Sequence, residues 1–93
     1  MAVLIELEFS GVSARQYDTV DRKVGSRSSK LPEGLLFHSA TITDAGLRVV
    51  DLWESPEAFE RFFERAQPVI KEVGITGRPD MKTTEVHNHF VNK

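Results

Sequence analysis

The sequence contains no cysteine, so the fold has no disulfide framework and the protein has no thiolate to use as a nucleophile or a metal ligand. No apolar run approaches the roughly 20 residues that a membrane helix needs. Neither charge sign dominates: the formal net charge is −2 over 93 residues, without the basic stripe that nucleic-acid binding requires. These absences predict a protein that binds neither a membrane nor a nucleic acid.

The first residues lack the features of a secretory signal. MAVLIELEFSG has no basic region, and Glu6 and Glu8 interrupt its apolar residues. Apolar side chains recur at every second position from Val3 to Phe9, which is the period of a strand with one buried face. We therefore expect a strand over residues 3–9 and a cytoplasmic protein.

The overall composition is that of a small globular protein, 40% hydrophobic and 28% charged. At this length we expect residues 1–93 to form a single domain. A domain of this size buries only about 60–65% of its unfolded surface, so pairing with a second copy would add buried area.

The segment after the first strand has the pattern of a short amphipathic helix. Ser13 and Gln16 form a capping-box pattern, in which each side chain satisfies a free N–H group of the first turn. Tyr17, Val20 and Val24 make a narrow apolar stripe, and Gly25 suits the position after the helix. The charged residues are expected to face solvent: Arg15, Asp18, Asp21 and Arg22. Residues 25–34 follow as a loop, either a solvated connector or a flap over a pocket.

Residues 35–43 and 46–54 predict a β-hairpin, with a turn in which Gly46 accepts a positive φ angle. With an even number of loop residues, His38 lies opposite Asp51, and Leu36 lies opposite Trp53. A three-residue loop would shift the register by one and separate His38 from Asp51. We favour the even register.

A second helix follows the hairpin. Ser55 suits the N-cap position and Pro56 the first turn, where its missing N–H group costs nothing. Apolar residues then recur at helical spacing and are expected in the core: Phe59, Phe62, Phe63, Ala66, Ile70 and Val73. Pro68 predicts a kink or a break near residues 65–67, because it removes a backbone hydrogen bond. Gly74 is expected to end the helix.

A last strand is predicted over residues 81–91, with Glu85, His87 and His89 on one face. Side chains two positions apart on a strand are about 7 Å apart at Cα, so the two histidines could both reach one metal ion. A third ligand would have to come from Glu85, from another strand or from a partner, and we predict no metal site.

The order strand–helix–strand–strand–helix–strand is the ferredoxin-like βαββαβ pattern, an α+β fold with a four-stranded antiparallel sheet. Right-handed crossovers place both helices on one face of that sheet. The residues expected under the helices are apolar: Val3, Ile5, Leu7, Phe9, Phe37, Val50 and Leu52. The residues expected on the open face are mixed: Leu4, Glu6, Glu8, Leu36, His38, Ala40, Val49, Asp51, Trp53, Glu85, His87 and His89.

An uncovered sheet face that carries a tryptophan and several aliphatic side chains is unfavourable in water. Two copies packed sheet against sheet would bury it. We therefore expect a homodimer through the open sheet face, with a partly polar cavity between the sheet and the partner.

The stretch RVVDLWESPEAF at residues 48–59, followed by Phe62 and Phe63, resembles the dimeric α/β-barrel superfamily, and within it the group related to antibiotic-biosynthesis monooxygenases. The element order extends the resemblance over essentially the whole chain. The resemblance implies a dimer and an oxygenase that acts on an aromatic or polyketide-like molecule without a cofactor. Related haem-degrading enzymes use a histidine on the second helix, and residues 56–73 contain none.

The candidate catalytic residues are His38 and Asp51. A histidine opposite an aspartate has its tautomer fixed and its basicity raised, which suits a general base near neutral pH. The alternative interpretation is a structural hydrogen bond between them. The candidate ligand-binding residues share the same expected face: Trp53, Glu6, Leu36 and His87. Trp53 would stack on an aromatic ligand or anchor the dimer.

Two functions fit these residues. One is a small monooxygenase-like enzyme, and the other is a non-catalytic dimeric module that binds a small molecule or a partner. A cavity beside His38 that is larger than a few waters distinguishes them, because the enzyme requires the space and the module would fill it with side chains.

Overall fold

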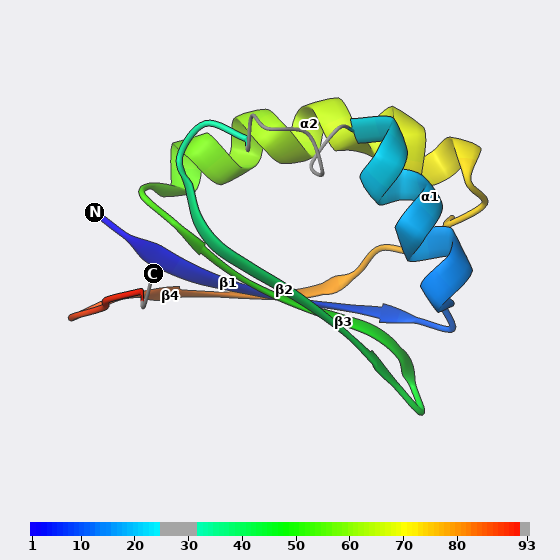
Figure 1. Cartoon of the computed structure of the whole chain (residues 1–93), viewed down its shortest axis with the longest axis horizontal. Coiled ribbons are helices and arrows are strands. Elements are labelled where there is room, and N and C mark those ends of the chain that lie inside the picture. The colour runs from blue at the N-terminus through cyan, green and yellow to red at the C-terminus, as the bar shows by residue number, and fades with distance from the viewer. Residues whose placement is uncertain (25–31, 92–93) are drawn as a thin grey trace.

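The computed structural model describes residues 1–24 and 32–91, which form strands and helices in the predicted order (Figure 1). The elements are β1 (Val3–Ser10), α1 (Ala14–Val24), β2 (Leu35–Thr43), β3 (Gly46–Trp53), α2 (Pro56–Glu72) and β4 (Asp80–Glu85). The strands form one antiparallel sheet in the order β2-β3-β1-β4, and both helices lie on the same face of it (Figure 1). The predicted ferredoxin-like βαββαβ fold is confirmed. Gly25 and most of the loop suggested as a connector or flap, residues 25–31, lie outside the described residues.

α1 begins with the predicted capping box. The backbone N–H of Ser13 donates to Oε1 of Gln16 at 3.0 Å, and the N–H of Gln16 donates to Oγ of Ser13 at 3.2 Å. Asp21 is only 8% exposed, so the expectation that it faces solvent is wrong. It stands four residues after Tyr17, one helical turn along, and therefore belongs to the same inward stripe.

α2 begins at the predicted N-cap and continues through Pro68. Oγ of Ser55 accepts a hydrogen bond from the N–H of Ala58 at 3.1 Å, which confirms the predicted cap. The helix then runs from 56 to 72 without interruption, so of the kink or break predicted near residues 65–67 the break is wrong. The carbonyl that Pro68 leaves without its usual partner belongs to Glu64, an exposed residue, and water can hydrogen-bond to it there.

α2 ends at a glycine, as predicted. Gly74 has a φ of 96°, a conformation that costs glycine little because it has no Cβ. The N–H of Ile75 donates to the carbonyl of Ile70 at 3.1 Å, and the N–H of Gly74 donates to that of Lys71 at 3.0 Å. This Schellman arrangement satisfies carbonyls at the end of the helix and turns the chain back toward the sheet.

The hairpin has the even register. His38 lies opposite Asp51, and the two-residue turn at 44–45 brings Thr43 opposite Gly46. The pairing of Leu36 with Trp53 is wrong, because an irregularity in β2 at this point places Leu35 opposite Trp53. A β-bulge of this kind inserts one unpaired residue and changes which residue meets the partner strand.

The assignment of β2 and β3 residues to the two faces of the sheet is also corrected. β1 pairs with β3 so that Val3 lies opposite Trp53 and Ile5 lies opposite Asp51. Directly paired residues share a face, so Trp53, Asp51 and His38 lie under the helices together with Val3 and Ile5. The open face instead carries three residues expected in the core: Phe37, Val50 and Leu52.

The reason for this reversal is the composition of β3. Leu47 and Val49 are apolar at odd positions, and Val50 and Leu52 are apolar at even ones. A strand that is apolar on both faces does not indicate which face lies under the helices, and a shift by one residue moves every side chain to the other face. Asp51 was expected on the open face, but it lies under the helices.

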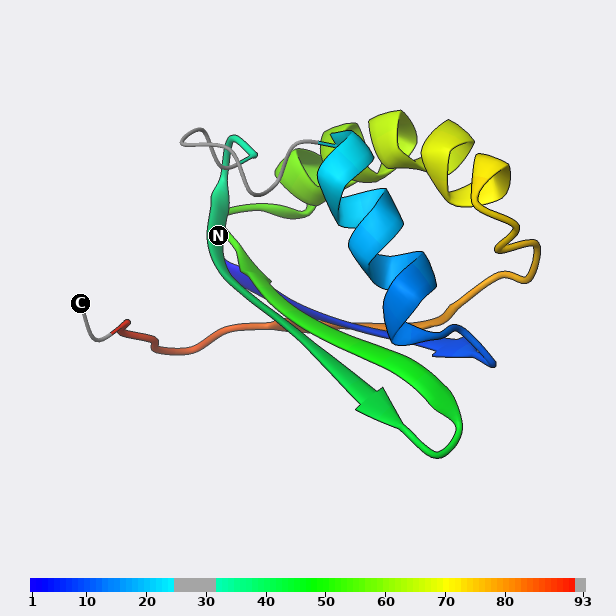
Figure 2. The same cartoon turned by 45° about the vertical axis from the view of Figure 1, so that its right-hand side comes forward.

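β4 is shorter than predicted and ends at Glu85, opposite Val3 at the start of β1. The N–H of Val86 still donates to the carbonyl of Ala2 at 2.9 Å, and beyond that point β1 offers no further strand residues. His87 and His89 therefore lie outside any strand and are exposed, in a segment that leads away from the sheet (Figure 2).

The core fills the space between the sheet and the helices. Trp53 is fully buried at its centre, and apolar residues of β1, β3 and α2 surround it. The tip of the β2–β3 hairpin extends beyond the helices (Figure 2), which is consistent with the 51% exposure of Ile42. Over residues 1–24 and 32–91, no helix is both long and apolar enough to cross a membrane.

Candidate functional site

A cavity of about 310 Å³ lies between the sheet and the two helices. This volume is at the lower end of the range that small-molecule pockets occupy. Polar side chains contribute to its wall from three elements: Tyr17, Asp21, His38 and Asp51. The remaining wall is almost entirely aliphatic and aromatic. The cavity was expected on the open face, between the sheet and a partner, but it lies on the helix side, because that is where His38, Asp51 and Trp53 point.

Hydrogen bonds join three of these side chains and Trp53 into one chain. Nε1–H of Trp53 donates to Oδ2 of Asp51 at 3.2 Å, and Oδ1 of Asp51 lies 2.6 Å from Nδ1 of His38. The hydroxyl of Tyr17 lies 2.6 Å from Nε2 of His38. Because a carboxylate only accepts, Nδ1 of His38 carries the proton, and in the neutral ring Nε2 accepts the hydroxyl proton of Tyr17.

Asp51 is 4% exposed and would be costly to bury without partners. The two donors from His38 and Trp53 engage both of its oxygens. Within the described residues, no buried side-chain nitrogen or oxygen is left without a hydrogen-bond partner. The carboxylate is therefore held in one orientation, and it holds the His38 ring in turn.

The hydrogen bond that His38 donates to Asp51 raises the pKa of His38 above its ordinary value of 6.5. Burial lowers the same pKa, whereas the negative charges of Asp51 and then of Asp21 raise it. The net upward direction shows that Asp51 outweighs the loss of solvation. An imidazole whose tautomer is fixed and whose basicity is raised by a carboxylate is suited to act as a general base.

Aromatic side chains form the wall next to Asp51. The Trp53 ring meets Phe59 edge-on with ring centres 5.8 Å apart, and its centre is 5.5 Å from that of Phe62. Phe59 in turn stacks on Phe63 at 5.3 Å. Because Trp53 is fully buried and packed on both phenylalanines, it supports the pocket and positions Asp51, while a smaller part of its surface can meet a ligand.

The other candidate ligand-binding residues lie away from this cavity. Glu6 is on the opposite face of the sheet, where its carboxylate lies 2.7 Å from the guanidinium of Arg48. Leu36 is at the irregularity of β2 and is exposed, and His87 follows the end of β4. None of these three residues lines the pocket. Within residues 1–24 and 32–91, no three His, Cys, Asp or Glu side chains gather as a metal site would require.

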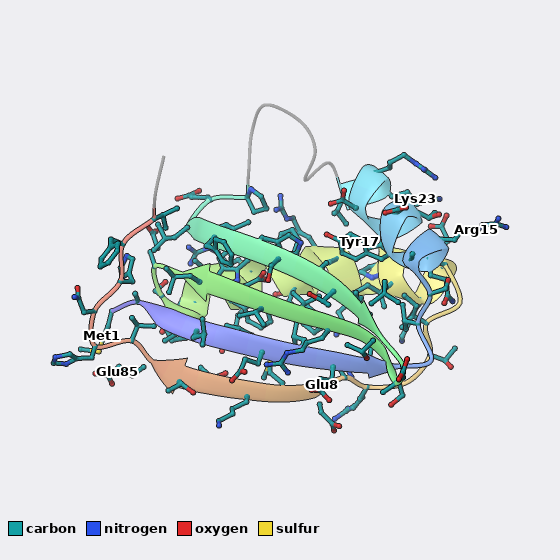
Figure 3. All side chains as sticks on the ribbon, turned by 60° about the horizontal axis from the view of Figure 1, so that its bottom comes forward. Met1, Glu8, Arg15, Tyr17, Lys23 and Glu85 are labelled. Atoms are coloured by element: carbon teal, nitrogen blue, oxygen red, sulfur yellow. The ribbon has the colours of Figure 1, made fainter. Side chains whose placement is uncertain are left out.

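Two pocket residues were not among the predicted site residues. Tyr17 was expected only as part of the apolar stripe of α1, and Asp21 was assigned to solvent. Figure 3 shows Tyr17 on the sheet side of α1, with Arg15 and Lys23 directed outward. The spacing of Tyr17, Val20, Asp21 and Val24 is the helical i, i+3, i+4, i+7 pattern, which contains the signal for both residues.

No protein-family model matches the sequence, and no curated protein matches it significantly. Solved structures do match. A protein from Chloroflexus aurantiacus assigned to the antibiotic biosynthesis monooxygenases is 13% identical, with a TM-score of 0.66 over 99% of this chain and 100% of that one. SnoaB, a cofactor-independent oxygenase from Streptomyces nogalater, is 9% identical, with a TM-score of 0.63 over 98% of this chain and 97% of SnoaB.

A third match is a monooxygenase from the gene ActVA-Orf6 of Streptomyces coelicolor, in complex with the ligand nanaomycin D. It is 18% identical, with a TM-score of 0.56 over 99% of this chain and 92% of that one. The protein therefore has the fold of the antibiotic biosynthesis monooxygenases, which are dimeric α/β-barrel proteins, at low sequence identity. The resemblance that residues 48–63 suggested is confirmed at the level of the fold.

Proposed function

We propose that the protein is a cofactor-independent monooxygenase-like enzyme, acting in the cytoplasm on an aromatic or polyketide-like small molecule. The observation that carries this proposal is the hydrogen-bonded pair of the half-buried His38 and the buried Asp51, which places a basic imidazole at the wall of an otherwise apolar cavity. An apolar site with a few polar groups suits a flat substrate that has one acidic proton. SnoaB, a cofactor-independent oxygenase, and the monooxygenase bound to nanaomycin D have the same fold and support the same class of chemistry.

The reaction begins with a proton transfer from an activated CH₂ group, or its enol, to His38. The resulting anion gives one electron to dioxygen, and the substrate radical and superoxide combine to form a peroxide bond. The peroxide then takes the proton back from His38, loses water and leaves a carbonyl, so that CH₂ and O₂ become C=O and H₂O. Dioxygen takes all the electrons, and the protein supplies the base and excludes bulk water. The imidazolium that forms is stabilised by Asp51.

Anthrone is a suitable probe, since its central methylene is acidic and becomes the carbonyl of anthraquinone. We expect the protein to accelerate dioxygen uptake and anthraquinone formation above the rate in buffer. His38→Gln should reduce kcat by roughly a hundredfold, the usual contribution of a positioned general base. His89→Gln, which replaces an exposed histidine away from the pocket, is the matched control and should retain the activity. Equal rates for the wild-type protein and His38→Gln would contradict the proposal.

The alternative is a non-catalytic module. The side-chain-filled space expected for such a module is not found beside His38, so in this form of the alternative the module binds a small molecule in the cavity without turning it over. One observation favours it: both ring nitrogens of His38 already have partners within the protein, Asp51 and Tyr17. A module of this kind would bind anthrone without any increase in dioxygen uptake. His38→Gln would then lower stability and leave the background rate unchanged.

We also propose that the single domain, residues 1–93, works as a homodimer joined through the open sheet face. The corrected face still carries apolar side chains in a row across the strands, among them Leu4, Leu52 and the 45% exposed Phe37. The central polar group, Arg48, has both of its carboxylate partners on the same face of the same chain. A surface with its charges already paired can be covered by a second copy at a lower desolvation cost.

A further inference from the structure

Tyr17 and His38 lie next to each other in the wall of the cavity. Tyr17 comes from α1, whereas His38 comes from β2, and their rings are nearly parallel, with centres 6.1 Å apart and planes 11° apart. The hydroxyl oxygen of Tyr17 is 2.6 Å from Nε2 of His38, which is a short hydrogen bond. Both residues line the cavity.

This contact constrains how His38 can act as a base. Nδ1 donates to Asp51, so the lone pair on Nε2 is the only basic position of the neutral ring. That lone pair is directed at the hydroxyl of Tyr17. A substrate would have to displace the Tyr17 side chain to reach Nε2 directly. If it does not, its proton can reach His38 only through the Tyr17 oxygen.

We propose that Tyr17 is the catalytic residue that touches the substrate, and that it relays the substrate's proton to His38. The proposal rests on the proposed function, since it assigns a further residue to the same proton transfer. In this step the bond between the substrate and its acidic hydrogen breaks and a new O–H bond forms on Tyr17. At the same time the original Tyr17 O–H bond breaks and an N–H bond forms at Nε2 of His38. The substrate is left as an anion, and the positive charge rests on His38.

The charged groups around Tyr17 and His38 favour proton transfer toward His38. Asp51 lies beside the imidazole on β3, and Asp21 lies on α1, one turn after Tyr17. Both carboxylates stabilise an imidazolium at His38, and both contribute to the raised pKa of that residue. The proton returns from His38 through Tyr17 to the peroxide when water is lost, so the base is restored at the end of the turnover.

The relay can be tested without oxygen chemistry by using para-nitrophenol, whose phenolate is yellow. Bound to the wild-type protein, the probe should ionise at a lower pH than in buffer, because its proton is taken up by the chain of Tyr17 and His38. Tyr17→Phe keeps the ring and removes the hydroxyl, so it should abolish this shift while retaining binding. His38→Gln should also abolish it. Arg15→Ala, on the outer side of the same helix, is the matched control and should retain it.

Kinetics with anthrone give a second readout. Tyr17→Phe should lower kcat by at least tenfold and change KM less than about twofold, since the relay acts in the proton transfer and not in binding. If Tyr17→Phe retains both the ionisation shift of para-nitrophenol and the wild-type kcat, while His38→Gln loses both, the relay is wrong. The proposed function would remain intact in that case. Failure of para-nitrophenol to bind the wild-type protein at millimolar concentration would overturn both.

Discussion

The two faces of the sheet carry the same kinds of polar side chain in very different surroundings. Under the helices, one carboxylate, Asp51, is almost fully buried and accepts hydrogen bonds from His38 and Trp53. On the open face, Arg48 is 37% exposed and donates to Glu6 and Glu8. In the interior, charges interact strongly and missing partners are costly, whereas solvent weakens both effects at the surface. The burial of the Asp51 carboxylate therefore distinguishes the candidate site from the surface ion pairs of Arg48.

The hydrogen-bonded side chains under the helices are also better placed for catalysis than those on the open face. The Asp51–His38 pair is held by packing on both sides, by Trp53 and its phenylalanines below and by Tyr17 above. Its geometry is therefore fixed before a ligand arrives, which is the condition for effective general-base catalysis. Arg48 has two partners and is not among the residues that line the cavity between the sheet and the helices.

The largest expected effect is the loss of the buried indole. Trp53→Ala removes the most buried large side chain and leaves Asp51 with one donor fewer, so the free energy of unfolding should fall by about 3–5 kcal/mol. Urea titration followed by circular dichroism measures this. Trp53→Phe, which retains an aromatic ring, should lose less and remains measurable if the alanine variant does not fold. A loss below about 1 kcal/mol in Trp53→Ala would contradict the central position of this residue.

The next prediction separates the two faces as interaction surfaces. Phe37→Glu places a charge on the open face, which should raise the dissociation constant of the dimer at least tenfold, because a charge buried without a partner is costly. Ile42→Glu is the matched control, since Ile42 is similarly exposed on the same strand but on the helix-side face. Analytical ultracentrifugation measures both. A monomeric wild-type protein, or equal dissociation in the two variants, would contradict a dimer through the open face.

The third prediction concerns pH. Because the pKa of His38 is raised in the folded protein, its charged form stabilises the fold fully below the unfolded value of 6.5, and this contribution is lost as pH rises through the higher folded value. Asp51→Asn removes the main cause. The stability difference between the wild-type protein and Asp51→Asn should therefore be larger at about pH 6 than at about pH 9. Urea titrations at the two pH values measure it. A difference that is the same at both values would rule out the coupling between His38 and Asp51.

The smallest effect is expected on the open face. Arg48→Ala removes two ion pairs that solvent reaches, and the monomer should lose less than about 1 kcal/mol. Introducing Phe37→Glu into both proteins would keep dimerisation from contributing to the comparison. A loss as large as that of Trp53→Ala would show that the two faces do not differ in the way described.

The order of the elements could be read from local patterns, because the caps at Ser13 and Ser55 and the glycine at the end of α2 are local signals. The hairpin register was also accessible, since its short turn fixes which residues face each other. The pairing of His38 with Asp51 therefore followed from the sequence.

The position of the site could not be predicted in the same way. Whether Asp51 faces the helices depends on the pairing of β1 with β3, and these strands are distant in sequence and are not linked by a turn. β3 is apolar on both faces, so its sequence does not indicate which face lies under the helices. The part played by Tyr17 depends on how α1 packs over β2, which no local pattern encodes.

The most direct test of the account is to map where an aromatic ligand binds. The amide and side-chain NMR signals of the protein would be followed as para-nitrophenol is added. The largest shifts are expected at Tyr17, His38 and Phe59, around the cavity between the sheet and the helices. Shifts that cluster instead at Glu6, Arg48 and Leu52 would place the ligand on the open face and would contradict the proposed site.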